Sequence, residues 1–158
     1  LANVSELAKK AAAVAQELKD KEKELNELKA EIAKSKAGEL FDNVKDLGAV
    51  KLITADLGEA DANALRSMVD SAKDKGDDIV VIFAGKQEAK GTCSFICYCG
   101  KAAIANGAHA GNIVREVATI AGGAGGGKPD SAMAGGKDIT KIADALNAAE
   151  EIVKAKLK

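Results

Sequence analysis

Apolar residues recur along residues 4–32 with the seven-residue period of a coiled-coil helix. Eight of the nine seam positions are apolar, Lys21 is the exception, and the intervening residues are mostly Glu, Lys and Gln. An isolated helix gains most of its stability from packing such a seam, so the pattern predicts a helical arm over residues 1–36 that pairs with something. A second copy of the chain, another part of the same chain and the domain that follows all remain open. The side chains expected to carry self-association are Leu7, Val14, Leu18, Leu25, Leu28 and Ile32.

Residues 37–158 have the patterns of a small globular domain. Residues 36–38 (KAG) should end or break the first helix, and the apolar positions of residues 40–47 predict a short second helix that Gly48 stops. Residues 50–55 are rich in β-branched side chains and predict a strand. Residues 79–84 are apolar throughout, which is typical of a central strand covered on both faces, and residues 92–99 predict its antiparallel return strand.

Three further helices are expected. The first follows Asp61 as its N-cap, the second opens at His109 or Gly111, and the last begins at Lys137–Asp138. The fold class is therefore α/β in the α+β sense: a small mixed sheet packed with helices, preceded by the heptad-patterned arm.

The segment 122–137 (GGAGGGKPDSAMAGGK) contains seven glycines in three clusters. Glycine weakens ordinary elements, so this density predicts an ordered loop with positive-φ turns or with backbone that a partner approaches closely. Backbone N–H groups beside lysines suit an anion such as a phosphate. The candidate nucleic-acid-binding residues are Gly122, Gly123, Gly125, Gly126, Gly127, Lys128, Gly135, Gly136, Lys137 and Arg115.

The same segment carries a family resemblance. The pattern GGxGGGxPD…AxAGGK, preceded by HAGxxVREVA at His109–Ala118, resembles the C-terminal, DHHA1-type domain of bacterial-type alanyl-tRNA synthetases. That resemblance covers essentially the whole chain and implies a module that binds the outer corner of tRNA. It also implies tethering of tRNA between aminoacylation and editing sites, and self-association through the helical arm. ATP, magnesium and zinc would belong to parts of the parent synthetase that this fragment lacks, so no cofactor is expected here.

Charge is distributed unevenly along the chain. The net charge is −1, but residues 86–137 hold six basic and three acidic side chains, a net charge of +3. This fits a limited phosphate footprint better than a wide nucleic-acid groove. No apolar run approaches the ~18 residues of a membrane span, and the N-terminus lacks the order of a signal peptide. A chain that starts at Leu1 reads as a fragment of a larger, cytoplasmic protein.

The residues for catalysis or metal binding are missing from the pattern. His109 is the single histidine, and GGGKPD lacks the spacing of a phosphate-binding P-loop. Cys93, Cys97 and Cys99 alternate on one face of a strand, as core residues do, and match no pair of zinc ligands. We expect a non-catalytic binding module without a metal site. The alternatives are the substrate-binding domain of a DHH-type exonuclease and a pure dimerisation module.

Overall fold

The computed structural model describes residues 2–42 and 44–158. It begins with one long helix, α1 (Ala2–Leu40), and contacts divide the chain into two compact units, Leu1–Ile32 and Ala33–Lys158. Each unit is described by itself. Within the described residues, no helix combines the length and apolar character that crossing a bilayer requires.

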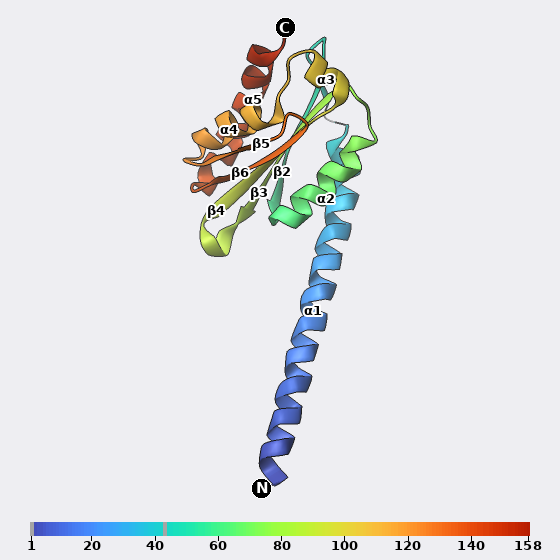
Figure 1. The fold of residues 1–158 in the computed structure, drawn as a ribbon, viewed down its shortest axis with the longest axis vertical. Helices are drawn as coiled ribbons and strands as arrows, with labels where there is room; N and C mark the ends of the chain where they lie inside the picture. Colours follow the sequence, from blue (N-terminus) through green and yellow to red (C-terminus); the bar gives the residue numbers. More distant parts are fainter. Residues whose placement is uncertain (1, 43) are drawn as a thin grey trace. The chain divides into compact units, whose positions relative to one another are not determined.

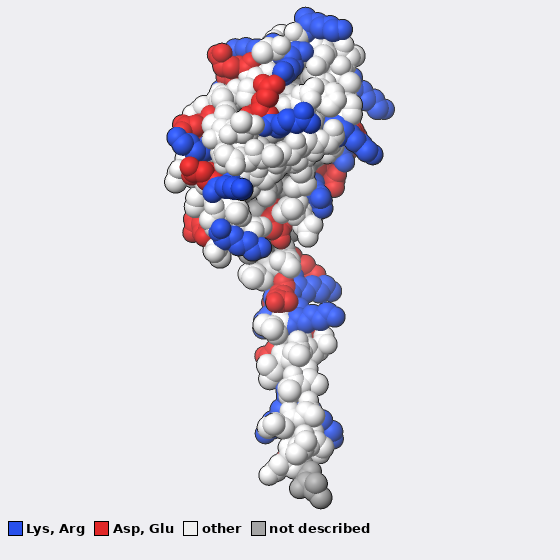
Figure 2. Space-filling view, turned by 60° about the vertical axis from the view of Figure 1, so that its left-hand side comes forward, with Lys and Arg blue, Asp and Glu red and all other residues white. Residues whose placement is uncertain are grey.

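The predicted long N-terminal helix is confirmed, and its apolar seam lies exposed. The exposed fractions run from 50% at Leu28 to 73% at Val4. Short-range ion pairs stabilise the polar side, as in Lys23–Glu27 at 3.9 Å. Figure 2 shows the result as long white stretches of α1 between charged side chains.

The second unit is a six-stranded mixed sheet with the order β1-β2-β3-β4-β6-β5 (Figure 1). The β2–β3 pair is parallel and every other pair is antiparallel. The predicted fold class is therefore confirmed. The strands are β1 (Val44–Asp46), β2 (Lys51–Glu59), β3 (Ile79–Gln87), β4 (Thr92–Cys99), β5 (Ala124–Gly127) and β6 (Ser131–Gly136), and the helices are α2 (Ala62–Lys73), α3 (Lys101–Ala105), α4 (Ala110–Ile120) and α5 (Ile142–Lys156), with 3-10 turns at Glu88–Lys90 and Ile139–Lys141.

Helices cover the two faces of the sheet unequally. α2 packs against β3 and β4 on one face, whereas α4 and α5 pack on the other (Figure 1). Strand β3 is buried from Ile79 to Gly85, which confirms the predicted central strand. Phe83 faces the α2 side and Phe95 of β4 faces the α4 side, and both are fully buried.

The three cysteines lie in the core on the α4 side of β4, as their alternation predicts. Cys93, Cys97 and Cys99 are each at most 2% exposed and unbridged. Burial raises the pKa values of the Cys93 and Cys97 thiols, because a thiolate loses its hydration there.

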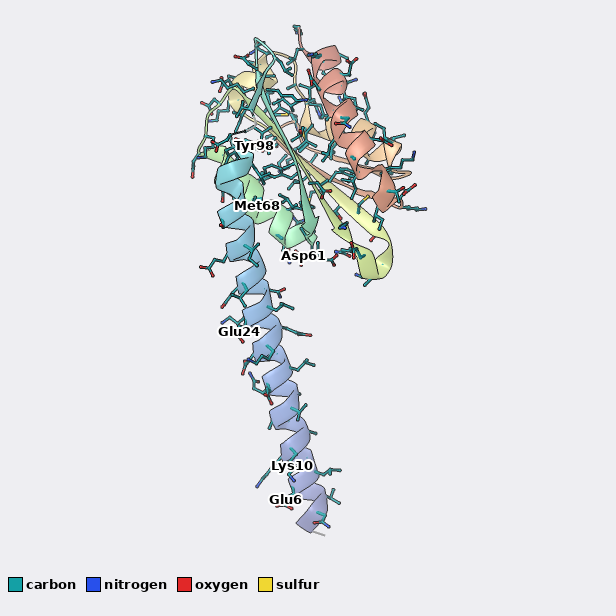
Figure 3. The ribbon with its side chains drawn as sticks, turned by 180° about the vertical axis from the view of Figure 1, so that it is seen from behind. Glu6, Lys10, Glu24, Asp61, Met68 and Tyr98 are labelled. Atoms are coloured by element: carbon teal, nitrogen blue, oxygen red, sulfur yellow. The ribbon has the colours of Figure 1, made fainter. Side chains whose placement is uncertain are left out.

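Side chains at the helix starts satisfy backbone donors that would otherwise lack a partner. Asp61 accepts a hydrogen bond from the Ala64 N–H at 2.8 Å and caps α2, along which Met68 follows two turns later (Figure 3). His109 Nδ1 accepts from the Asn112 N–H at 3.3 Å and caps α4. Asp138 caps the 3-10 turn that leads into α5.

Two local predictions are wrong. α1 runs through residues 36–38 to Leu40, because one exposed glycine costs only about 1 kcal/mol in a helix. The predicted helix over residues 40–47 is replaced by β1 and a tight turn. Gly48 adopts φ +86° there, and its N–H donates to the Asp46 carboxylate at 2.8 Å. This turn returns the chain antiparallel to β1, so that the pair forms a hairpin at the sheet edge.

An ion-pair cluster joins this edge hairpin to the last helix. Glu150 of α5 accepts from Lys154 at 2.7 Å and from Lys45 of β1 at 2.8 Å. These two ammonium groups, Lys154 first, lower the pKa of Glu150 from 4.5 to about 2. The carboxylate therefore favours the folded state only while it is ionised.

Substitution Glu150→Gln should make the stability of the fold depend less on pH at acidic pH. Because the folded pKa lies below the unfolded value, the contribution is present above pH 4.5 and disappears as the pH falls towards 2. Thermal melts between pH 6 and 2 should show a smaller loss of Tm for Glu150→Gln than for the unchanged chain. Glu151→Gln removes a neighbouring carboxylate that makes no ion pair within the described residues, and should keep the original slope. Identical slopes for all three chains would contradict the assignment.

Candidate nucleic-acid interface

The glycine-rich segment forms a β-hairpin, which corrects the prediction of a loop over residues 122–137. β5 and β6 pair from Ala124–Gly135 to Gly127–Ala132, and the turn closes where the Lys128 N–H donates to the Ser131 carbonyl at 3.2 Å. β6 also pairs with β4, so the hairpin extends the sheet and β5 forms its edge. Strands are predicted from alternating apolar and polar side chains. Glycine has no side chain, so the sequence of these two strands shows no such alternation.

Most of the glycines have a packing reason of their own. A Cβ at Gly123 would overlap the Gly135 carbonyl, and one at Gly125 would overlap Ala134. At Gly136 it would lie 2.5 Å from Cys93 Sγ. Such contacts are too close for any side chain, so the hairpin backbone itself requires glycine at these positions.

Gly135 differs from the other six glycines of the segment. Gly122 adopts φ +64°, a conformation that favours glycine. The φ angle of Gly135 lies outside the range from +20° to +160°, so its backbone conformation is open to other residues. The nearest atom to a Cβ at Gly135 would be the Cys93 carbonyl oxygen, at 3.9 Å. Gly135 is exposed, and neither packing nor backbone conformation demands a glycine there.

Helix α4 closes against the edge strand through backbone contacts. The Ala110 N–H donates to the Pro129 carbonyl at 2.8 Å, and the Gly111 N–H donates to the Lys128 carbonyl at 3.2 Å. A Cβ at Gly111 would lie 2.5 Å from the Gly127 carbonyl oxygen. The start of α4 thus holds the hairpin turn, and these donors take up the free carbonyls beside the edge.

Arg115 reaches from α4 around the edge strand. Its Nε donates to the Gly125 carbonyl at 3.2 Å, and its Nη2 would lie 3.0 Å from a Cβ at Gly126. Gly126 pairs with Met133, which belongs to the α2 side of the sheet. Directly paired residues share a face, so the Arg115 guanidinium lies on the α2 side although α4 packs on the other.

Lys128 and Lys137 are both exposed and stand at opposite ends of β6. A strand of six residues separates them by roughly 20 Å. Within the described residues neither lysine has a carboxylate within ion-pair distance. The predicted binding residues therefore follow the hairpin and do not form one cluster, and their binding role stays a prediction.

Two hollows open beside the hairpin. The first, here called the α2-side pocket, has a volume of about 380 Å³ and is lined by Arg66 and Lys73 of α2, Ile96 of β4, and Gly126, Ser131 and Met133 of the hairpin. The second has a volume of about 520 Å³ and is lined by residues that include Ser94, Gly135 and Lys137. Arg66 and Met133 were not among the candidate residues, because only the strand order β4-β6-β5 brings them together.

The described residues contain no group of three or more His, Cys, Asp or Glu side chains able to hold a metal ion. His109 serves as the cap of α4, where its Nδ1 accepts from the Asn112 N–H. The arrangement offers cations, glycine backbone and small hydroxyl side chains, which are groups that bind a polyanion.

Comparison with known proteins agrees with this architecture. The profile of the DHHA1 domain family matches residues 49–155. The C-Ala domain from Aquifex aeolicus alanyl-tRNA synthetase has a similar fold, with a TM-score of 0.64 and 26% identity. The match covers 71% of this chain and 98% of that domain.

Curated relatives extend the similarity to nearly the whole chain. The alanine–tRNA ligase of Shouchella clausii (strain KSM-K16) is 40% identical over 152 residues, which is 96% of this chain and 17% of the relative. That of Alkaliphilus oremlandii (strain OhILAs) is 35% identical over 151 residues, 95% of this chain and again 17% of the relative. The chain thus spans about a sixth of the length of these relatives.

Alanine substitutions should separate the structural glycines from Gly135. Gly125→Ala should lower the free energy of unfolding by about 1–3 kcal/mol, because its Cβ overlaps β6. Gly135→Ala should change it by less than about 0.5 kcal/mol, because the added methyl group would make only an ordinary van der Waals contact with the Cys93 carbonyl oxygen, at 3.9 Å. Urea denaturation of the two variants and the unchanged chain measures both values. Equal destabilisation by the two substitutions would contradict the hairpin geometry.

Proposed function

The chain belongs to the DHHA1 domain family, and from this premise we propose that it is a C-terminal module of an alanyl-tRNA synthetase that binds tRNA. The alanine–tRNA ligase relatives support the parent protein, because they match nearly the whole chain. In this proposal the module itself is non-catalytic and works in the cytoplasm. It serves the remainder of the parent chain by holding its substrate.

The hairpin supports tRNA binding through cationic groups that make no ion pair within the described residues. Lys128 and Lys137 are exposed at its two ends, and Arg115 is already oriented by the Gly125 carbonyl. Lysine and arginine side chains with exposed backbone bind the sugar-phosphate surface without reading sequence. The observation that carries the proposal is Gly135, an exposed glycine that the fold does not require, beside a hollow that Lys137 also lines. A ligand that approaches the backbone closely explains why this position carries no side chain.

The mechanism we propose is tethering. A module that binds the outer corner of tRNA leaves the acceptor end free to move between an aminoacylation site and an editing site elsewhere in the parent chain. A contact of modest affinity is sufficient, since the tethered substrate stays at a high effective concentration near both sites. The few available cations fit such a modest contact.

Self-association through α1 is the second part of the proposal. Seven large apolar side chains of α1, from Val4 to Ile32, are exposed at fractions of 50–73%. Their heptad spacing matches the seam of a coiled coil, which a second copy of the same helix would cover. The occupant we propose is therefore the α1 helix of a second chain.

The double substitution Lys128→Glu with Lys137→Glu should weaken binding of folded tRNA at least tenfold and lower its salt dependence. Each lost phosphate contact removes about 0.7–0.9 from the slope of log K against log salt. Both side chains are exposed, so the thermal midpoint should change little. Fluorescence titrations with folded tRNA at two salt concentrations measure affinity and slope.

Lys90→Glu with Lys101→Glu is the matched control, because it makes the same change of charge at exposed lysines outside the hairpin. This control should retain most of the affinity. Equal losses of tRNA affinity in both double variants would mean that binding depends only on the net charge of the chain, and would contradict the proposal. A preference of the unchanged chain for a short single-stranded oligonucleotide over folded tRNA would favour the exonuclease alternative instead.

Substitution Leu18→Asp should abolish self-association while leaving the globular unit folded, because it places a charge in the middle of the apolar seam. Asn26→Asp adds the same charge outside the seam and should leave the association unchanged. Analytical ultracentrifugation of the three chains measures the masses. A monomeric unchanged chain at about 100 micromolar, or a dimeric Leu18→Asp variant, would contradict the role given to α1, because a dimer with a Kd of about 1 micromolar is mostly formed at that concentration.

A further inference from the structure

The α2-side pocket has the size and lining of a site for a small ligand. Its volume of about 380 Å³ lies within the range of known ligand pockets, roughly 300–1,000 Å³. It lies where α2 ends its cover of the sheet and the exposed hairpin begins. Gly126 and Gly127 of its lining were candidate nucleic-acid-binding residues from the sequence, whereas Arg66, Ile96 and Met133 were not.

Cationic groups stand on two sides of this pocket. Arg66 of α2 lines one wall, and within the described residues no carboxylate pairs with it. On the opposite side the Arg115 guanidinium lies over Gly126, which also lines the pocket. Asp70 is the one carboxylate among the lining residues, and Lys73 holds it at 2.6 Å. The pocket therefore offers the guanidinium of Arg66 to an anion, and the guanidinium of Arg115 lies beside it at Gly126.

The floor of the pocket is apolar. Ile96 is buried, whereas the half-buried Met133 presents its side chain beside it. A thioether is polarizable and packs favourably against aromatic rings. Ser131 lines the same space and adds a hydroxyl group that can donate or accept a hydrogen bond. A planar ring that carries hydrogen-bonding groups fits this floor better than a bare anion does.

We propose that the α2-side pocket binds one nucleotide of an RNA, with its base on Met133 and Ile96 and its phosphate against Arg66 and Arg115. This inference rests on the proposed function and deepens it. The hairpin lysines contact the sugar-phosphate chain at two ends of β6, and the pocket adds a discrete subsite between α2 and β5. Arg66 then sets the affinity for a nucleotide, because within the described residues its guanidinium is the one with no hydrogen bond or ion pair.

The two methionines of the chain make this subsite directly observable. Met133 lines the pocket, whereas Met68 lies in the core at 1% exposure. In the full chain labelled with 13C-methyl methionine, adenosine 5′-monophosphate should shift the Met133 resonance in a saturable way and leave the Met68 resonance unmoved. Inorganic phosphate at equal concentrations should leave both resonances unmoved, and adenosine should require a several-fold higher concentration. An unmoved Met133 resonance, or equal shifts with phosphate alone, would overturn the proposal.

Arg66→Gln should weaken binding of the mononucleotide about tenfold, the usual size of one charge-assisted hydrogen bond. Arg66 is exposed, so its substitution should not disturb the core. An unchanged Met68 resonance would show that the variant keeps the fold. The control Lys90→Gln, which removes an exposed cation outside the pocket, should bind as the unchanged chain does. Equal mononucleotide affinity of Arg66→Gln and the unchanged chain would overturn the role of Arg66 and with it the proposal.

Titration of the same variants with folded tRNA distinguishes this subsite from the tether. Arg66→Gln should lose several-fold in tRNA affinity. If the unchanged chain binds tRNA but no mononucleotide, the pocket assignment fails and the tether stands. If it binds the mononucleotide but not folded tRNA, the pocket stands and the proposed function fails.

Discussion

The close approach of two backbones, the first turn of α4 and the edge strand β5, is the constraint on which the geometry of the candidate binding surface depends. Glycines at Gly111 and Gly127 permit it, since a Cβ at Gly111 would lie 2.5 Å from the Gly127 carbonyl oxygen. The contact fixes the hairpin turn through two backbone hydrogen bonds from α4. It also brings α4 near enough for Arg115 to reach around β5 and bond the Gly125 carbonyl. Side chains at these glycines would move the helix away and withdraw the guanidinium from the α2 side of the sheet.

Regular apolar patterns predicted most of this fold correctly, and glycine explains where prediction failed. The central strand, its antiparallel partner and the caps Asp61 and His109 follow from side-chain periodicity and from local hydrogen bonds. β5 and β6 have few side chains to alternate, so their pairing was hidden in a segment that resembles a loop. The predictions that rested on Gly38 and Gly48 were wrong for opposite reasons. The first interrupts nothing, whereas the second, at positive φ, makes the turn of an edge hairpin.

Only those residues of the candidate site that lie close to one another along the sequence could be predicted. Segment 122–137 and Arg115 were named because they are neighbours along the chain. Positive φ was anticipated and occurs at Gly122 and Gly126, but close packing within the hairpin was not anticipated. Packing, not a ligand, requires Gly123, Gly125 and Gly136. Arg66 could not be found in this way, since it lies on the helix between β2 and β3 and meets the hairpin only through the order of the strands. Contacts of this kind need the three-dimensional arrangement.

The reactivity of the buried cysteine thiols can be used to measure how often the core of the folded chain opens. All three thiols of the sequence lie under α4 and α5, and burial raises the pKa values of Cys93 and Cys97, so a reagent in solvent finds no thiolate at the surface. Modification of Cys97, which is fully buried on the α4 side of the sheet, must therefore wait for the core to open. Cys93 also lines the hollow beside Gly135 and Lys137, so its labelling is not a report of that opening. The rate of thiol labelling at Cys97 would follow the opening of the core beneath the helix that carries Arg115. A ligand that clamps α4 onto the hairpin would slow that chemistry from a distance, without touching a sulfur atom.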